Sequence, residues 1–536
     1  MLRFRATDTG VSVIAPEQWP LVQMTAKAPA VEIVEHSCYF DTHDMALWRQ
    51  GLLIVLRRRN GHVWRQIVRP RRSWLHEPLF PPWMTSRVPC PDGVLDLESI
   101  QRELDDLFKK GPRIAAGDLQ PVVHMTCTRK RWLLNFPDGQ SIRLLEEKGH
   151  VSAPMHPNGN QDSLFHEVVV KTTRGGLDGW MFQRVLTLVQ PWAPTFVGTT
   201  PLERAFWSYG VTPDRRAPVP DLALSADTPL EVAFTRLCQF LWQKMADAHA
   251  LVNGEEVASG RLGLQELLQS ATYLRMLSAA YASLITDEAR EQLDAELEWL
   301  IDTLAPMDQW QNFLAYGLSP FVAACQQQTQ GSDPKLDKLQ QRAMAQNEDH
   351  LHQIRLVLNS FRFTRLLLGF GYWFNGRLWR HRLDRRQRKQ LQVHMAPSVT
   401  IVMERHYRRL LQMHERIHEI DWAIGRAIRE KGEMLHALVD LFMIALRRHD
   451  GDDLFSLNLN QFCQVLHKID YLHRFRSQLT QISPDSDSQI NTRFHEWVQQ
   501  QTRQASVDAQ QSWEAFIHCQ PFWTRLKGDR GEGGMT

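Results

Sequence analysis

The sequence lacks a strong net charge and a long apolar run. It has 536 residues, with 62 lysines and arginines against 60 aspartates and glutamates, and a formal net charge of +2. Attraction of the whole chain to a polyanion is therefore excluded, and any such attraction has to be local. The longest apolar run, near Leu438–Leu446, is interrupted by Asp440 and is too short to span a bilayer. The first residues, Met1–Ala6, lack the hydrophobic stretch of a signal peptide.

Paired cysteines are missing as well. The seven cysteines are scattered and none forms a C-x-x-C pair; they lie at positions 38, 90, 127, 238, 325, 463 and 519. This spacing excludes a zinc knuckle and argues against a disulfide framework, so it favours reduced thiols. Together with the missing signal peptide, it predicts a cytoplasmic protein.

The N-terminal part of the chain has the pattern of an antiparallel sheet. Short runs rich in β-branched and aromatic residues predict strands at 52–59, 63–69, 126–136, 142–147 and 165–172. Asn60-Gly61 and Pro137-Asp138-Gly139 separate successive runs, and such turn sequences are typical of hairpins. Two helices are predicted near Leu95–Phe108 and Leu177–Val189. Serial hairpins of this kind predict a closed β-barrel or tunnel.

The C-terminal part has the apolar spacing of amphipathic helices. Apolar residues recur every three or four positions, as in Leu230–Leu251, Leu262–Leu284 and Asp337–Gly369. We therefore predict an α+β protein: a tunnel domain at 1–212, a Pro-rich linker at 213–229, an all-α bundle at 230–522 and a Gly-rich disordered tail at 523–536.

Cationic residues recur at alternate positions along the predicted strands. Residues two apart share a face, so Arg57 pairs with Arg59, Arg129 with Arg131, and Arg3 with Arg5. The pairs Arg65 and Arg69, and Arg143 and Glu147, share a face in the same way. If these faces point inward they form a site for phosphate oxygens, which match the planar guanidinium fork. The alternative is a set of outward, solvated charges.

Several motifs resemble the CYTH, or triphosphate-tunnel, family. The segment Cys38–Leu47 (CYFDTHDMAL), followed by Arg57-Arg58-Arg59, is similar to the family's Y-F/Y-D/E-T-P-D and R-x-R motifs. Further similarities follow at Leu119-Gln-Pro121, Arg129-Lys-Arg-Trp132, Glu147-Lys-Gly149, Glu167–Gly175 and Leu202–Phe206. The resemblance implies a β-tunnel fold and triphosphate as the ligand, with Arg5, Arg57, Arg59, Arg69, Arg129, Arg131 and Arg204 as phosphate-binding residues.

The C-terminal part resembles a CHAD domain, a helical module associated with polyphosphate. The segment Leu358–Gly369, followed by Trp373 and Trp379, carries this resemblance. The order CYTH then CHAD resembles that of bacterial inorganic triphosphatases. Only Arg275 remains of the basic set usual in the first such helix, at Leu264–Arg275.

The sequence departs from the CYTH pattern at the acids that hold a divalent metal. The family's opening E-x-E-x-K strand is Leu2–Arg5 here, with Arg3 in place of a glutamate. Glu147 and Glu167 are kept, and they are the residual metal ligands that the resemblance implies, for Mg²⁺ or Mn²⁺ if the protein is active. We therefore expect an interior rich in arginine and poor in acids, which binds phosphate better than it hydrolyses it.

Three functions follow from these patterns. The first is binding of inorganic polyphosphate, triphosphate or a related polyanion with weak or no hydrolysis. The alternatives are an active divalent-metal-dependent triphosphatase, and a helical scaffold with a vestigial tunnel. Nucleic acid is not favoured as a partner, because few aromatic residues lie among the cations.

Two features of the helical part add hypotheses. Arg355, Arg362 and Arg365 have spacings of seven and three, so on one helix they share a face and form a polyanion patch. A solvated helix face is the alternative. The H-E-x-x-H motif at His414–His418 has zinc-protease spacing, but neighbouring arginines and the apolar stripe around Ile417 favour an exposed amphipathic helix.

Overall fold

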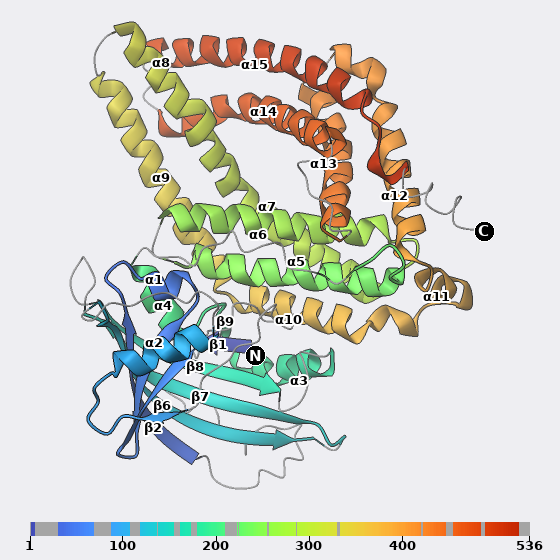
Figure 1. Ribbon diagram of the computed structural model, residues 1–536. Helices are drawn as coiled ribbons and strands as arrows, with labels where there is room; N and C mark the ends of the chain where they lie inside the picture. The colour runs from blue at the N-terminus through green and yellow to red at the C-terminus, as the bar shows by residue number, and fades with distance from the viewer. Residues whose placement is uncertain are drawn as a thin grey trace. The chain divides into compact units, whose positions relative to one another are not determined.

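The protein combines an antiparallel sheet with many helices (Figure 1). The computed structural model describes residues 2–5, 31–68, 87–107, 118–136, 138–154, 161–172, 179–209, 222, 224–254, 257–285, 287–329, 333–419, 422–445, 454–483 and 488–524. Contacts divide the chain into two compact units. The first comprises Met1–Pro220, Trp242–Leu264 and Leu358–Arg377, and the second comprises Asp221–Leu241, Gln265–Val357 and Leu378–Thr536. The predicted domain boundaries stay a prediction.

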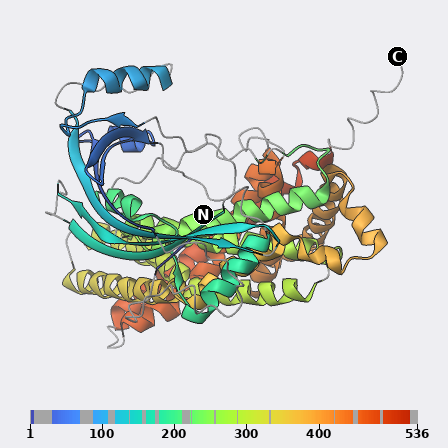
Figure 2. The ribbon, with the colours of Figure 1, turned by 90° about the horizontal axis from the view of Figure 1, so that it is seen from below.

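The first unit contains one sheet of nine strands in the order β5-β4-β3-β2-β6-β7-β8-β1-β9. The strands are β1 (Leu2–Arg5), β2 (Val31–Asp41), β3 (Leu53–Arg59), β4 (His62–Val68), β5 (Val88–Pro89), β6 (Gln120–Asn135), β7 (Ser141–Ala153), β8 (Gln161–Thr172) and β9 (Thr195–Phe196). Asn60 and Gly61 both have positive φ, which confirms the tight hairpin between β3 and β4. Figure 2 shows that the sheet is strongly curved.

The prediction of a closed barrel is wrong for the described residues. Strands β5 and β9 end the sheet, and no described pairing joins them. A barrel requires an unbroken ladder of paired strands around its circumference. Each terminal strand has two residues, which leaves too few hydrogen-bonding groups to complete such a ladder. The sheet is therefore curved but open.

One face of this sheet is apolar and buried, as the alternation predicts. Ile142 and Val168 are 0% exposed, and Leu144 and Val170 are 1% exposed. Phe4 of β1 lies on the same face, opposite Val168, and its ring contacts the Phe196 ring edge to face.

Helices α3 (Gly179–Val189) and α10 (Phe361–Gly376) contact each other in the first unit. A Cβ atom added at Gly371 would lie 2.3 Å from the Phe182 ring, so only glycine allows this approach. The other helices of the N-terminal segment are α1 (Ala46–Arg49), α2 (Leu97–Leu107), the 3₁₀ turn η2 (Gln190–Trp192) and α4 (Pro201–Ser208).

The remaining elements are helical. They are α5 (Leu230–Val252), α6 (Val257–Ala280), α7 (Glu288–Asn312), η3 (Phe313–Leu318), α8 (Ser319–Thr329), α9 (Pro334–Leu358), η4 (Leu378–His381), α11 (Arg385–Leu391), α12 (Met395–Leu411), η5 (His414–Glu419), α13 (Trp422–Ala445), α14 (Leu454–Ile482) and α15 (Ser488–Ile517). A core of the second unit forms around Trp310, Phe313, Phe475 and Phe494. Within the described residues, no helix is both long and apolar enough to cross a membrane.

Candidate functional site

Strand register brings most of the predicted phosphate-binding arginines to one face of the sheet. Arg129 lies opposite Glu147, Glu147 lies opposite Glu167, and Glu167 lies opposite Arg5. Directly opposed residues share a face, so the alternation extends from strand to strand. We call the following set the cationic face: Arg3, Arg5, Arg57, Arg59, Arg129, Arg131, Arg143 and Lys171.

A cavity of about 330 Å³ opens on this face. Its charged lining consists of Arg3, Glu35, Arg57, Arg129, Glu147, Lys171 and Glu203. Its apolar lining includes Tyr39, Leu53, Phe165 and Cys127. Thr200 and Glu203 come from the start of α4, so this helix as well as the sheet shapes the cavity.

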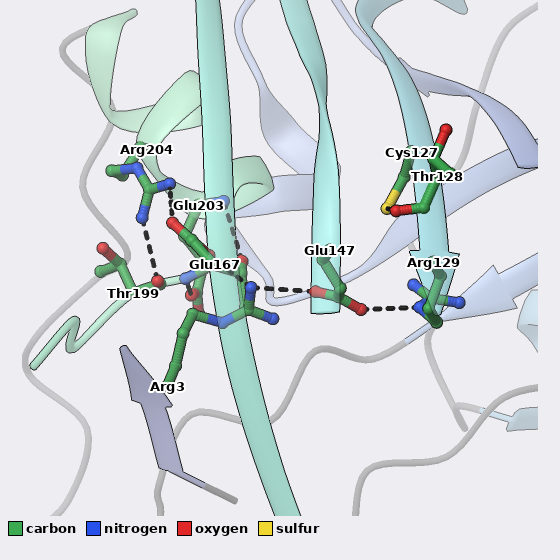
Figure 3. Close-up of polar contacts among 10 residues, drawn as sticks. Arg3, Cys127, Thr128, Arg129, Glu147, Glu167, Thr199, Glu203 and Arg204 are labelled. Carbon is green, nitrogen blue, oxygen red and sulfur yellow. Dashed lines mark hydrogen bonds and ion pairs between the residues drawn. The ribbon is translucent and has the colours of Figure 1, made fainter. Parts of the chain in front are cut away.

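Glu147 accepts hydrogen bonds from two arginines (Figure 3). Arg129 Nε donates to Glu147 Oε1 at 2.7 Å, and Arg3 Nη1 donates to Glu147 Oε2 at 3.0 Å. The Glu147 side chain is only 7% exposed. Its two carboxylate oxygens are therefore held between two guanidinium groups from β1 and β6.

Glu167 is paired in the same way. Arg3 Nη1 donates to Glu167 Oε2, and Arg204 Nη2 donates to Glu167 Oε1. Arg204 belongs to α4, and its Nη1 also donates to the Thr199 carbonyl oxygen at 3.1 Å. Arg3 thus bridges both glutamates, and the network runs Arg129–Glu147–Arg3–Glu167–Arg204, with its three central residues buried.

Burial and ion pairing shift the pKa values of the network residues in opposite directions. Burial by itself raises the pKa of Glu147, but Arg3 and Arg129 outweigh it, so the net pKa lies below the usual value. Burial by itself lowers the pKa of Arg3, but attraction to Glu147 and Glu167 outweighs it, so the net pKa lies above the usual value. For Lys171 burial dominates and the pKa is lowered. The paired glutamate and arginine are therefore charged at neutral pH.

These residues do not fit a divalent cation. Mg²⁺ and Mn²⁺ need carboxylate oxygens with free lone pairs, held close together. Arg3 lies between the two predicted ligands, Glu147 and Glu167, and the four carboxylate oxygens all accept from arginine. Within the described part of the chain, no group of three or more His, Cys, Asp or Glu side chains could hold a metal ion.

The other predicted arginines are placed as follows. Arg57 lines the cavity and pairs with Glu35 at 3.3 Å. Arg59 is half-buried, and Arg5 and Arg131 are exposed, all three on the cationic face. Arg65 lies on the opposite face, where it pairs with Glu103 of α2 at 2.5 Å.

Arg69, the last predicted phosphate ligand, lies outside the described residues.

The cavity contains more acids than the sequence led us to expect. Glu35 and Glu203 line it in addition to Glu147. Glu35 shares a face with Ser37 and Tyr39, so alternation along β2 could have identified it. Glu203 forms a capping box with Thr200, a T-x-x-E pattern that is visible in the sequence. The expectation of an acid-poor interior is therefore wrong, although each of Glu35, Glu147 and Glu167 is paired with arginine.

The predicted polyanion patch is not on one helix. Arg355 belongs to α9, whereas Arg362 and Arg365 belong to α10. Ser360 is the N-cap of α10, and its side chain accepts from the Phe363 N–H. A new helix begins there, so the spacing of seven between Arg355 and Arg362 does not put them on one helix face. The prediction of a single helix over Asp337–Gly369 is wrong.

The H-E-x-x-H motif also lies outside an α-helix. His414–Glu419 is a 3₁₀ helix, which does not give residues i and i+4 their α-helical alignment. His414 Nδ1 accepts a hydrogen bond from Trp513 Nε1 at 2.8 Å. The expected α-helix is therefore wrong at this segment, and the observed geometry does not support a zinc site.

Comparison with known proteins supports one of the two predicted domains, the CHAD domain. A family model of the CHAD domain matches residues 246–439, so the chain carries a CHAD domain in this range. The comparison with curated proteins gives no match. The resemblance of the N-terminal part to the CYTH family stays a prediction.

Three solved structures are partly similar. The CHAD domain from the plant Ricinus communis is 17% identical, with a TM-score of 0.46, over 56% of this chain and 96% of that chain. PptA from Streptomyces chartreusis is 14% identical, with a TM-score of 0.38, over 54% of this chain and 100% of that chain. A protein from Hippeastrum described as having a dominant triphosphatase activity is 13% identical, with a TM-score of 0.22, over 40% of this chain and 96% of that chain. These TM-scores are too low to decide fold or function.

Proposed function

We propose that the cationic face binds inorganic triphosphate, polyphosphate or a related polyanion, with weak or no hydrolysis. The observation that carries this proposal is the gathering of Arg3, Arg57, Arg129 and Lys171 around one cavity. The side chains of Arg57 and Arg129 are 21% and 28% exposed, so a ligand in the cavity can reach them. Guanidinium groups form strong, charge-assisted hydrogen bonds with phosphate oxygens.

The distribution of charge favours an extended anion over a compact one. The cations of the face come from five strands, β1, β3, β6, β7 and β8, and only some of them line the cavity. Inside the cavity the glutamates neutralise much of this charge, whereas Arg5, Arg131 and Arg143 are exposed around it. A chain of phosphates could contact both the cavity and these outer arginines. The presence of a CHAD domain in the same chain is compatible with a polyphosphate-related function.

Two neighbouring arginines on β3 provide the test. Arg57 lines the cavity, whereas Arg58 is exposed on the opposite face of the same strand. We expect Arg57→Gln to weaken tripolyphosphate binding about tenfold, the value of one charge-assisted hydrogen bond. Arg58→Gln should change the affinity by less than about twofold. Isothermal titration calorimetry at two salt concentrations measures both effects, and binding should weaken as salt rises.

The same titration separates the alternatives. Absence of heat at low salt, or equal losses in the two variants, would contradict the proposal and favour a scaffold. Phosphate release from tripolyphosphate with Mg²⁺ or Mn²⁺, abolished by Glu147→Gln, would instead favour a metal-dependent triphosphatase.

A further inference from the structure

Arg3 has an unusual position within the sheet. Its guanidinium group lies between Glu147 and Glu167, which are directly opposite each other on β7 and β8. The side chains are 6%, 7% and 1% exposed, respectively. Two opposed buried carboxylates repel each other unless a cation lies between them. In this protein that cation is a side chain of the chain itself.

The outer partners of the two glutamates complete the arrangement. Arg129 occupies the second oxygen of Glu147, and Arg204 occupies the second oxygen of Glu167. A divalent ion would need to displace Arg3 and would then lie between two further guanidinium groups. Repulsion from these groups opposes a doubly charged ion more strongly than a singly charged one.

We infer that Arg3 is a fixed internal cation that replaces a divalent metal ion, so the cationic face binds its anionic ligand independently of divalent metal. The part that concerns the ligand rests on the proposed function. A guanidinium group stays charged throughout the physiological pH range and cannot dissociate from the protein. Arg3 is therefore a positioning residue that holds both glutamates.

The first experiment measures metal binding without any phosphate ligand. Mn²⁺ titration of the wild-type protein, followed by electron paramagnetic resonance, should leave the free-ion signal unchanged. Arg3→Glu places a third carboxylate between Glu147 and Glu167, and it should bind Mn²⁺ and melt at a higher temperature when Mn²⁺ is present. Adding Glu147→Gln to this variant should abolish the binding.

Arg5→Glu is the matched control. Arg5 lies on the same strand and face, opposite Glu167, but its side chain is exposed. It should not acquire Mn²⁺ binding. Wild-type Mn²⁺ binding that is lost in Glu147→Gln overturns the inference, and this result does not depend on whether Arg3→Glu folds.

The second experiment compares tripolyphosphate binding to the wild-type protein in EDTA and in excess Mg²⁺. The Kd in EDTA should be no more than about twofold weaker than in Mg²⁺, whereas tightening by about tenfold or more in Mg²⁺ overturns the inference. Absence of binding under both conditions contradicts the proposed function, and the Mn²⁺ titration then still decides the role of Arg3.

Discussion

His249 is a buried residue whose protonation should affect stability. Its side chain belongs to the first unit, where it stacks on Phe363 with 5.1 Å between ring centroids and contacts Phe196 at 5.6 Å. The residue is 2% exposed, and burial lowers its pKa to about 4. Unfolding returns the imidazole to water, where its pKa is about 6.5. The unfolded state therefore binds more protons between these two values.

This difference predicts a loss of stability in acid. Because the folded-state pKa is depressed, the contribution is complete above about pH 6.5 and decreases as pH falls toward 4. Between pH 7.5 and 5, the wild-type free energy of unfolding should fall by about 2 kcal/mol more than that of His249→Phe. Urea denaturation at the two pH values measures the difference. His62→Gln, at an exposed hairpin position, should behave as the wild type, and an unchanged pH dependence in His249→Phe would contradict the prediction.

The N-terminal cap of helix α4 is part of the candidate site. Thr200 is its N-cap: the Glu203 N–H donates to Thr200 Oγ1 at 3.2 Å, and the Thr200 N–H donates to Glu203 Oε2 at 2.6 Å. Pro201 follows the cap, where its fixed φ suits the first turn. The same turn carries Arg204, which contacts Glu167. The cap therefore helps to hold the last arginine of the network.

Removal of this cap should affect both stability and binding. Thr200→Ala should cost about 1 kcal/mol of unfolding free energy, and Thr200→Ser should restore most of it. Arg204 would be held less firmly, so tripolyphosphate affinity should fall in Thr200→Ala and recover in Thr200→Ser. Chemical denaturation and calorimetry measure these two quantities. Equal behaviour of the two variants would show that the hydroxyl group is not needed.

The sequence predicted local elements better than their long-range arrangement. Turn residues and alternation identified β3, β4, β6, β7 and β8, and apolar spacing identified α5 and α6. The break between α9 and α10 was missed because apolar positions continue through it, at Leu358 and Phe363, and only the Ser360 cap marks it. Closure of the barrel was wrong because it depends on the terminal strands, whose pairing has no local sequence signal.

For the candidate site, too, local features were predicted better than long-range contacts. Alternation correctly grouped Arg57 with Arg59 and Arg129 with Arg131 on one face. The role of Arg3 could not be seen, because its contact with Glu167 joins residues 164 positions apart and depends on the register of β1 against β8. Local patterns fix which side a residue faces, whereas register fixes which charge lies beside it.

At the scale of the whole molecule, the first unit is not one continuous segment. The Phe196 N–H of β9 donates to Thr364 Oγ1 of α10 at 2.8 Å, and Trp242 Nε1 of α5 donates to the Leu367 carbonyl oxygen at 2.7 Å. Residues 242–264 and 358–377 therefore belong with the sheet. The sheet's unit includes helical residues that follow the predicted linker.

A truncated chain tests this division. A fragment of residues 1–229 lacks the α5 and α10 residues of the first unit, so it would expose apolar surface around Phe182 and Phe196. We expect it to bind a hydrophobic dye and to show no cooperative thermal transition, whereas the full chain melts cooperatively. A cooperative transition in the fragment would instead support an independent domain ending near residue 212.

Cys127 gives the cavity a further property. Its side chain lines the cavity, and burial raises the pKa of the thiol to about 12. Only the thiolate reacts readily with peroxides and alkylating agents, and the raised pKa keeps the thiol protonated at neutral pH. The thiol in the cavity is therefore unreactive at neutral pH, and oxidants should leave the shape of the cavity unchanged.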